Sequence, residues 1–261
     1  MAQGLDLDAL ADKYRRYVDE FRDSAGNLPA MMQLKLEHTE FVCENAKAIA
    51  DGEGFSPVER ELALAAALLH DTGRYEQFLR YNTFRDADSI DHAKLSYDII
   101  VEKGWTGNRA VLDAVLFHNL RELPPSLDAL SATAAKTVRD ADKLDIFRVL
   151  EVQVRETDWR GSSQAFWGLP VSAAPSRPVV DCIVSGKPVD YREIKSLPDF
   201  VLVQVGWMVS ELEYVTSLRL CHERGHLDFR RQFLHRLTDD SSIEIVCDLA
   251  EKRLKERLLQ K

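Results

Sequence analysis

The sequence has 261 residues, of which 45% are hydrophobic and 30% are charged, and its net charge is -9 at pH 7. This composition is typical of a soluble globular protein and argues against a low-complexity or fixed-period repeat protein. The acidic excess argues against nonspecific binding to nucleic acid or to anionic membranes, so the expected partner is a small molecule. No apolar run approaches the roughly 20 residues of a membrane span, and the start, MAQGLDLDAL, lacks the features of an export signal. We expect a cytoplasmic protein.

The first half of the chain shows helical periodicity. Apolar residues at helical spacing predict one helix from Leu7 to Phe21 and a second from Met31 to Ile49. On the second helix we expect Met31, Leu34, Phe41, Val42 and Ile49 to share the apolar face. A capping box, Ser56-Pro57-Val58-Glu59, predicts the start of the next helix. Later helices are expected at about 91–103, from the candidate N-cap Asn108 to His118, and at about 132–156.

The second half is less regular. Residues 159–178 carry scattered Gly, Ser and Pro and predict an irregular excursion. Helices are expected at 178–186, at 198–225 and over the last 35 or so residues. The predicted fold class is all-α, with an N-terminal helix at 1–29, a core domain at 30–157, and accessory segments at 158–261 packed on the same domain. The four cysteines are widely spaced, which favours buried free thiols over a zinc or redox site.

Four histidines in the first half lie on the apolar face of a predicted helix or at its end: His38, His70, His92 and His118. A single inward histidine is more often a hydrogen-bonded core residue than a ligand. Four such placements, with Asp71 directly after His70, favour a shared cation.

The long helix at 132–156 adds a carboxylate to this set. Asp142 follows Val138 and precedes Ile146 at helical spacing, so it points with the apolar stripe. Asp140 is turned about 200° away from it. Asp145, one turn further along the helix, is the competing candidate for the inward carboxylate. Its alternative interpretation is an acid on the helix surface or one that supports a ligand.

The order of these residues resembles the H...HD...D signature of the HD superfamily of metal-dependent phosphohydrolases. The signature would be formed by His38, then His70-Asp71 near a helix end, then Asp142 in the string ADKLD. The resemblance covers about residues 30–150. It implies an HD-domain helical bundle with additional C-terminal helices, and a first metal ion held by His38, His70, Asp71 and Asp142.

Two further histidines resemble those of dinuclear members such as the HD-GYP phosphodiesterases. This implies a second ion held by His92, His118 and a bridging Asp71, with Asp71 as a catalytic residue. The usual His-His pair reads His118-Asn119 here, and the GYP motif is missing, which argues against cyclic dinucleotide substrates. Mixed imidazole and carboxylate ligands suit Fe, Mn, Co or Zn, and two such ions can hold a bridging hydroxide for phosphoryl transfer.

Basic residues close in sequence to this site are candidates for holding a phosphate. We expect Arg74, three residues after Asp71, to contribute to catalysis and to substrate binding. Further candidates for substrate binding are Arg80, Tyr81, Thr83 and Arg85, and Lys94 is a weaker one. The alternative for each arginine is an ordinary surface ion pair, for example with Asp86 or Asp88. Substrate specificity is expected to lie in a loop at 74–91 and in the excursion at 159–178.

The string HERGH at 222–226 matches HExxH, the zinc-protease pattern, which requires a continuous helix. Gly225 is a common helix-ending residue, so this string predicts a helix C-terminus instead.

The expected function is therefore metal-dependent hydrolysis of a phosphate ester or anhydride in a small molecule or nucleotide. The alternatives are a mixed-valent diiron oxygenase on the same six ligands and a non-catalytic nucleotide-binding regulatory module. The sequence favours no particular oligomeric state.

Overall fold

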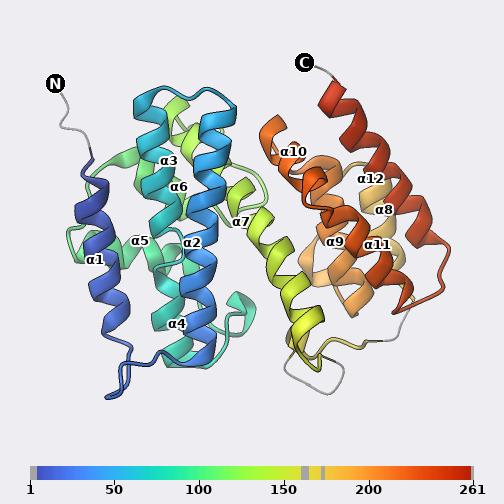
Figure 1. Cartoon of the computed structure of the whole chain (residues 1–261), viewed down its shortest axis with the longest axis horizontal. Coiled ribbons are helices and arrows are strands. Elements are labelled where there is room, and N and C mark those ends of the chain that lie inside the picture. Colours follow the sequence, from blue (N-terminus) through green and yellow to red (C-terminus); the bar gives the residue numbers. More distant parts are fainter. Residues whose placement is uncertain (1–4, 160–164, 172–173, 260–261) are drawn as a thin grey trace. The chain divides into compact units, whose positions relative to one another are not determined.

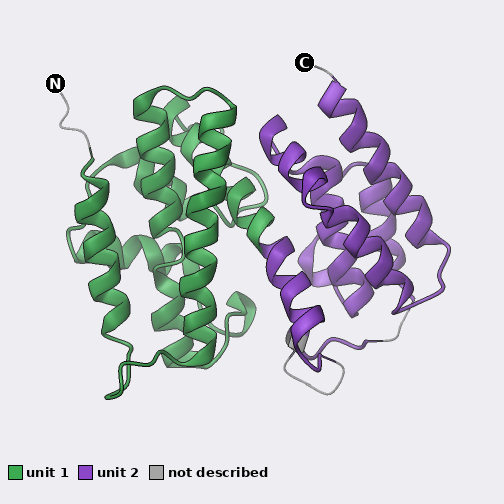
Figure 2. Cartoon of the chain, viewed as in Figure 1, with its two compact units in different colours: residues 1–145 green, residues 146–261 purple. Residues whose placement is uncertain are grey.

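The computed structural model describes residues 5–159, 165–171 and 174–259. Within these ranges every regular element is helical, which confirms the all-α prediction. The chain divides into two compact units, residues 1–145 and 146–261 (Figure 2). The boundary falls inside α7 (Ala129–Glu156). The domain limits at 30–157 and 158–261 stay a prediction.

The first unit is a bundle of helices connected by short segments (Figure 1). Its helices before α7 are α1 (Leu7–Asp19), α2 (Ala30–Gly52), α3 (Pro57–Leu69), α4 (Gly73–Tyr81), α5 (His92–Glu102) and α6 (Arg109–Phe117). α3 packs against α1, α2 and α6, and α5 packs against α4 and α6. Four alanines of α3 are fully buried, and their small side chains allow the neighbouring helices to approach closely: Ala63, Ala65, Ala66 and Ala67.

Capping side chains mark helix starts in this unit, and those at Ser56 and Asn108 were predicted. Ser56 and Glu59 form the reciprocal capping box that begins α3. Asp91 accepts hydrogen bonds from the first backbone N–H groups of α5, and Asn108 does the same for α6. These side chains satisfy N–H groups that no helical carbonyl reaches, so they define where each helix begins.

Three expectations for the first unit are corrected. α1 ends at Asp19, so Phe21 lies beyond the helix, although its ring still contacts Tyr17. Met31 and Phe41 of α2 are exposed, because they lie off the face that packs on α3. The segment expected as a loop at 74–91 begins within α4, which ends at Tyr81. Asn82 caps this helix in the left-handed conformation, and the segment continues through the short 3-10 helix η1 (Asp86–Asp88).

The second unit contains shorter helices than expected. Those after α7 are α8 (Arg177–Val184), α9 (Leu197–Ser210), α10 (Val215–Glu223), α11 (His226–His235) and α12 (Ser242–Leu259), with 3-10 turns η2 (Ala165–Gly168) and η3 (Tyr191–Glu193). The helix expected at 198–225 is interrupted between Ser210 and Val215, and the last 35 residues form two helices. Part of the excursion at 159–178 lies outside the described residues.

A buried arginine organises the second unit. Arg230 of α11 has no exposed surface and donates hydrogen bonds to Glu151, to Gln204 and to the backbone carbonyls of Phe147 and His226. A buried guanidinium is tolerated only when its donors are paired, so these contacts tie α7, α9 and α11 together.

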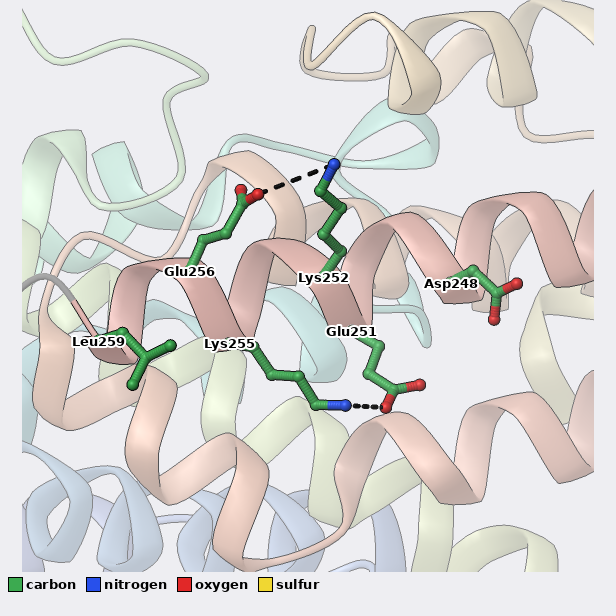
Figure 3. A pocket seen from close by; sticks show the side chains of 6 residues that line it. All are labelled: Asp248, Glu251, Lys252, Lys255, Glu256 and Leu259. Atoms are coloured by element: carbon green, nitrogen blue, oxygen red, sulfur yellow. Dashed lines mark hydrogen bonds and ion pairs between the residues drawn. The ribbon is translucent and has the colours of Figure 1, made fainter.

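The surface of α12 carries paired charges. A shallow hollow along this helix is lined by side chains that point outward, with Lys255 paired to Glu251 and Lys252 to Glu256 (Figure 3). Such exposed pairs one turn apart are ordinary solvated surface.

All four cysteines are free, with Cys221 and Cys247 buried and Cys43 and Cys182 half-buried. Among the helices of the described residues, none combines the length and apolar character needed to cross a membrane.

Candidate metal centre

The six predicted ligands all lie in the first unit and converge there; they are called the cluster below. His38 lies in the middle of α2, His70 caps the end of α3, Asp71 follows it, His92 begins α5, His118 caps the end of α6, and Asp142 lies in α7. The four histidines and Asp71 are buried. His70, His92 and His118 therefore reach the cluster from helix ends, whereas His38 and Asp142 reach it from within their helices.

Asp71 lies at the centre of the cluster. Its Oδ2 atom is 3.6 Å from Nε2 of His38 and 3.6 Å from Nε2 of His70. Its other oxygen, Oδ1, is 3.6 Å from Nε2 of His92 and 4.0 Å from Nε2 of His118. One carboxylate therefore presents one oxygen to each of two histidine pairs.

Carboxylates hold the Nδ1 atoms of two of these histidines. Nδ1 of His38 lies 2.6 Å from Oδ2 of Asp145, and Nδ1 of His92 lies 2.5 Å from Oδ2 of Asp86. An ionised carboxylate can only accept, so each Nδ1 donates. Asp145 was the competing candidate for the inward-facing carboxylate. It is fully buried and is the hydrogen-bond partner of His38. The role of Asp86 was missed, because no local spacing links it to His92.

Backbone carbonyls hold the other two histidines. Nδ1 of His70 donates to the carbonyl of Ala67, and Nδ1 of His118 donates to that of Val115, both over 2.7 Å. With every Nδ1 protonated, a neutral imidazole has its lone pair on Nε2, which is the ligand form. The Nε2 atoms of all four histidines face Asp71.

Two tests show that the cluster fits a metal. Nε2 of His70 is buried without a hydrogen-bond partner in the described part of the chain. Nε2 of His38 lies 3.1 Å from Oδ1 of Asp142. Ligands about 2.1 Å from one ion lie about 3.0–3.5 Å from each other, close to the separations seen here.

Two compact groups of ligand atoms result. His38, His70 and Asp142 form one group, and His70, Asp71 and His118 form the other, with all ligand atoms of a group within 4.8 Å of one another. A third group, Asp86, Asp91 and His92, is explained without an ion. Asp86 accepts from His92, while Asp91 caps α5 and accepts from the Asn119 amide.

Burial keeps most of the imidazoles neutral. It lowers the pKa of His70, and it lowers the pKa values of His92 and His118 to about 4. Burial would raise the pKa of the Asp71 carboxyl, but neighbouring cations, Lys35 above all, hold it well below its usual range. Neutral imidazoles around an ionised carboxylate are the protonation states that metal binding requires.

Asp142 and His38 behave as a pair. Burial and the charge of Lys35 lower the pKa of His38, but its contacts with Asp142 and Asp145 outweigh them and raise it above its ordinary value. The pKa of Asp142 is lowered, because the His38 contact outweighs the effect of burial. Asp140 is also buried, although the sequence turned it away from the Asp142 face.

Arg74 lies beside the cluster. Its Nε is 3.3 Å from Oδ1 of Asp71. The two N–H groups of its Nη1 are shared among Gln77, Asp86 and the carbonyl of Phe84, each within 2.9 Å. Nη2 has no hydrogen bond within the described residues. One edge of the guanidinium is therefore fixed, and one nitrogen remains to contact a ligand.

The other predicted substrate-binding residues contact their own neighbourhoods rather than the cluster. Arg80 pairs with Glu76, Arg85 with Asp88, and Lys94 with Asp98. Tyr81 is exposed, and the Thr83 hydroxyl accepts from the Arg85 backbone N–H. Their exposed partners on the same helix or turn explain these positions, and their roles in substrate binding stay predictions.

Sequence reasoning also missed Lys35. Its ammonium donates to Oδ2 of Asp71 over 2.7 Å. The available signal was its position three residues before His38, which places both side chains on the same side of α2.

The HERGH string does not form a zinc-protease helix. α10 ends at Glu223, Gly225 has a φ of 68°, and His226 begins α11. The predicted helix end is confirmed, and Nδ1 of His226 lies 2.6 Å from Oε1 of Glu151.

Residues 36–146 match the HD domain family. This segment is an HD domain. The matched range contains all six residues of the cluster and both carboxylates that hold its imidazoles, Asp86 and Asp145. HD domains are typically those of metal-dependent hydrolases, which agrees with the two groups of ligand atoms found here. No curated protein and no solved structure matches the chain.

Proposed function

We propose that this HD domain hydrolyses a phosphate ester or anhydride in a small molecule or nucleotide, with two divalent transition-metal ions. The observation that carries the proposal is the arrangement around Asp71. One of its oxygens faces His38 and His70, and the other faces His92 and His118. A carboxylate with ligand nitrogens on both sides is suited to bridge two ions.

The donor set supports the choice of metal. Four imidazoles and two carboxylates suit Fe, Mn, Co or Zn better than Mg, which prefers oxygen. When bound, two such ions supply a hydroxide nucleophile at neutral pH and neutralise charge on the phosphoryl group.

The protein's own residues hold and orient the reactants. Asp145 and Asp86 fix the His38 and His92 imidazoles with Nε2 toward the cluster. Arg74 is anchored by Asp86, so its unpaired Nη2 can reach a phosphate oxygen without losing that anchor. Bringing Lys35 and Arg74 to the two oxygens of Asp71 gives the site cations suited to an anionic substrate.

The positions of Lys35 and Arg74 also favour hydrolysis over the two alternative functions. A mixed-valent diiron oxygenase could use the same six ligands, but oxidation of a neutral substrate would not need cations beside the bridging carboxylate. A regulatory module without catalysis would not need the ligand geometry to be intact. Hydrolysis of a phosphate compound uses both features.

The test is phosphate release under anaerobic conditions. Protein loaded with Mn²⁺ or Fe²⁺ would be assayed against p-nitrophenyl phosphate, bis-p-nitrophenyl phosphate and the common nucleoside mono-, di- and triphosphates. We expect metal-dependent hydrolysis of at least one, reduced by about 100-fold or more in His70→Ala and Asp71→Ala. His222→Ala, which removes an exposed histidine of the second unit, serves as the matched control.

Hydrolysis that survives Asp71→Ala in the same preparation would reject the proposal. Substrate-dependent oxygen uptake by the iron-loaded protein, without phosphate release, would support the oxygenase instead.

A further inference from the structure

Lys35 makes a contact that a surface lysine does not. Its Nζ lies 2.7 Å from Oδ2 of Asp71, and the two side chains are only 17% and 4% exposed. Lys47, on the same helix, pairs with Asp51 over the same 2.7 Å, but those side chains are 58% and 47% exposed. The buried pair costs desolvation that the exposed pair does not, so the Lys35 position needs a reason.

The Lys35 ammonium has unused hydrogen-bonding capacity. It carries three N–H donors. Among the described residues only the Asp71 carboxylate accepts from it, and Nζ also lies 5.5 Å from the centroid of the Phe84 ring. Two donors therefore remain next to the cluster.

Arg74 approaches the same carboxylate from the other oxygen. Its Nε contacts Oδ1 of Asp71, and its guanidinium carbon lies 5.8 Å from the centre of the Phe84 ring. Lys35 and Arg74 therefore both lie near Phe84, each with donors that no described residue accepts.

A metal ion on the first group of ligands would compete with Lys35. Oδ2 of Asp71 faces Nε2 of His38 and of His70, so it is the oxygen closer to those ligands. A divalent ion and an ammonium on one oxygen repel each other strongly at such short range. Once the ion takes this oxygen, the ammonium needs another anion.

We propose that Lys35 is a phosphate-binding residue whose ammonium neutralises Asp71 in the metal-free protein and transfers to the phosphate of the substrate when Asp71 binds metal. This inference rests on the proposed function, because it explains how the same site selects an anionic substrate. A phosphate oxygen accepts from an ammonium as a carboxylate does, so the transfer preserves a charge-assisted hydrogen bond.

The experiment compares two binding reactions by titration calorimetry in Lys35→Met, Lys35→Arg and the control Lys47→Met. Inorganic phosphate is titrated into Mn²⁺-loaded protein, and Mn²⁺ into chelator-treated protein. For Lys35→Met we expect phosphate affinity to fall about tenfold or more, with Mn²⁺ affinity equal to or tighter than wild type. Lys35→Arg keeps the charge and should stay within about threefold for phosphate, and Lys47→Met should match wild type.

Phosphate affinity within about twofold of wild type in Lys35→Met overturns the inference, and so does wild-type protein that binds no phosphate. A parallel loss of Mn²⁺ affinity overturns it too, because Lys35 would then support Asp71 in place. If Lys35→Met fails to unfold cooperatively, Lys35→Gln replaces it. Neither titration requires turnover. Weakened phosphate binding without any hydrolysis would reject only the proposed function, while hydrolysis with unchanged phosphate binding would reject only this inference.

Discussion

Nε2 of His92 and Nε2 of His118 lie 3.1 Å apart in the interior of the HD domain. The Nδ1 atom of His92 donates to Asp86, and that of His118 donates to the Val115 carbonyl. In the neutral imidazoles both Nε2 atoms therefore carry lone pairs, which repel each other at this distance. A shared cation would relieve this repulsion, and Oδ1 of Asp71 lies within 4.0 Å of both nitrogens.

Removing one of these imidazoles should remove one metal ion. We expect protein purified without chelator or affinity-tag metal to contain about two transition ions per chain and His118→Ala to contain about one. Elemental mass spectrometry of matched preparations measures this. His235→Ala, which alters a partly exposed histidine paired with Glu244, should keep the wild-type content. One ion per chain in both wild type and His118→Ala would assign His92 and His118 to structural roles.

Removing Asp86 should weaken metal binding, although Asp86 is not one of the six predicted ligands. Asp86→Ala leaves Nδ1 of His92 without its acceptor and releases Arg74 from its anchor. Loss of such a supporting carboxylate typically costs about 10- to 100-fold in metal affinity. Calorimetric titration of the metal-free protein with Mn²⁺ measures the change.

Asp88→Ala is the matched control for Asp86, because Asp88 lies two residues away in η1 and its side chain is 52% exposed. Among the described residues its carboxylate pairs only with Arg85. Equal Mn²⁺ affinities for the two variants would mean that Asp86 does not position His92.

Gly73 permits α4 and α5 to approach each other. A Cβ at this position would lie 2.7 Å from the backbone nitrogen of Ser96 and 2.8 Å from the carbonyl oxygen of His92. Both are backbone atoms, so Gly73→Ala must move one helix, at a cost of about 1–3 kcal/mol in the free energy of unfolding. Urea unfolding of the metal-free protein measures this cost.

The displaced α5 would also carry His92 away from the cluster, so Gly73→Ala should lose metal. Gly107→Ala adds a Cβ that meets no atom within 4 Å and should change stability by less than about 1 kcal/mol. A wild-type unfolding midpoint for Gly73→Ala would show that the helices tolerate the extra carbon.

The metal-free protein should lose stability as the pH falls from 7 to 5. His92 and His118 have pKa values of about 4 in the folded protein, below the ordinary value of 6.5, because burial disfavours their charged forms. Between pH 6.5 and pH 4 the unfolded chain binds protons that the folded chain does not. The contribution of the two neutral imidazoles to the free energy of unfolding is therefore full above about pH 6.5 and declines toward pH 4. Each imidazole contributes about 2 kcal/mol of loss between pH 7 and 5.

The raised pKa of His38 acts with the opposite sign and reduces the total loss. Urea unfolding of chelator-treated protein at several pH values measures the slope. His118→Gln removes one titrating imidazole and should flatten it. Wild-type stability that stays constant between pH 7 and 5 would contradict the neutral state of the buried pair.

The sequence by itself determined where several helices begin and which side chains turn inward. Helix starts at Ser56 and Asn108 were predictable because a capping side chain satisfies N–H groups only two or three residues away. The inward direction of His38 and Asp142 followed from spacing along one helix, which repeats every 3.6 residues.

Only the tertiary structure decided how those side chains meet. The partner of the His38 imidazole, Asp145, lies 107 positions away in the sequence, and Lys35 reaches Asp71 across 36 positions. The contact between Asp86 and His92 depends on how the chain turns after α4, where the sequence indicated only a loop. Periodicity and capping act within a few residues, whereas these contacts form when helices pack. The nitrogen that each histidine turns toward the cluster and the central position of Asp71 therefore come from the packed bundle alone.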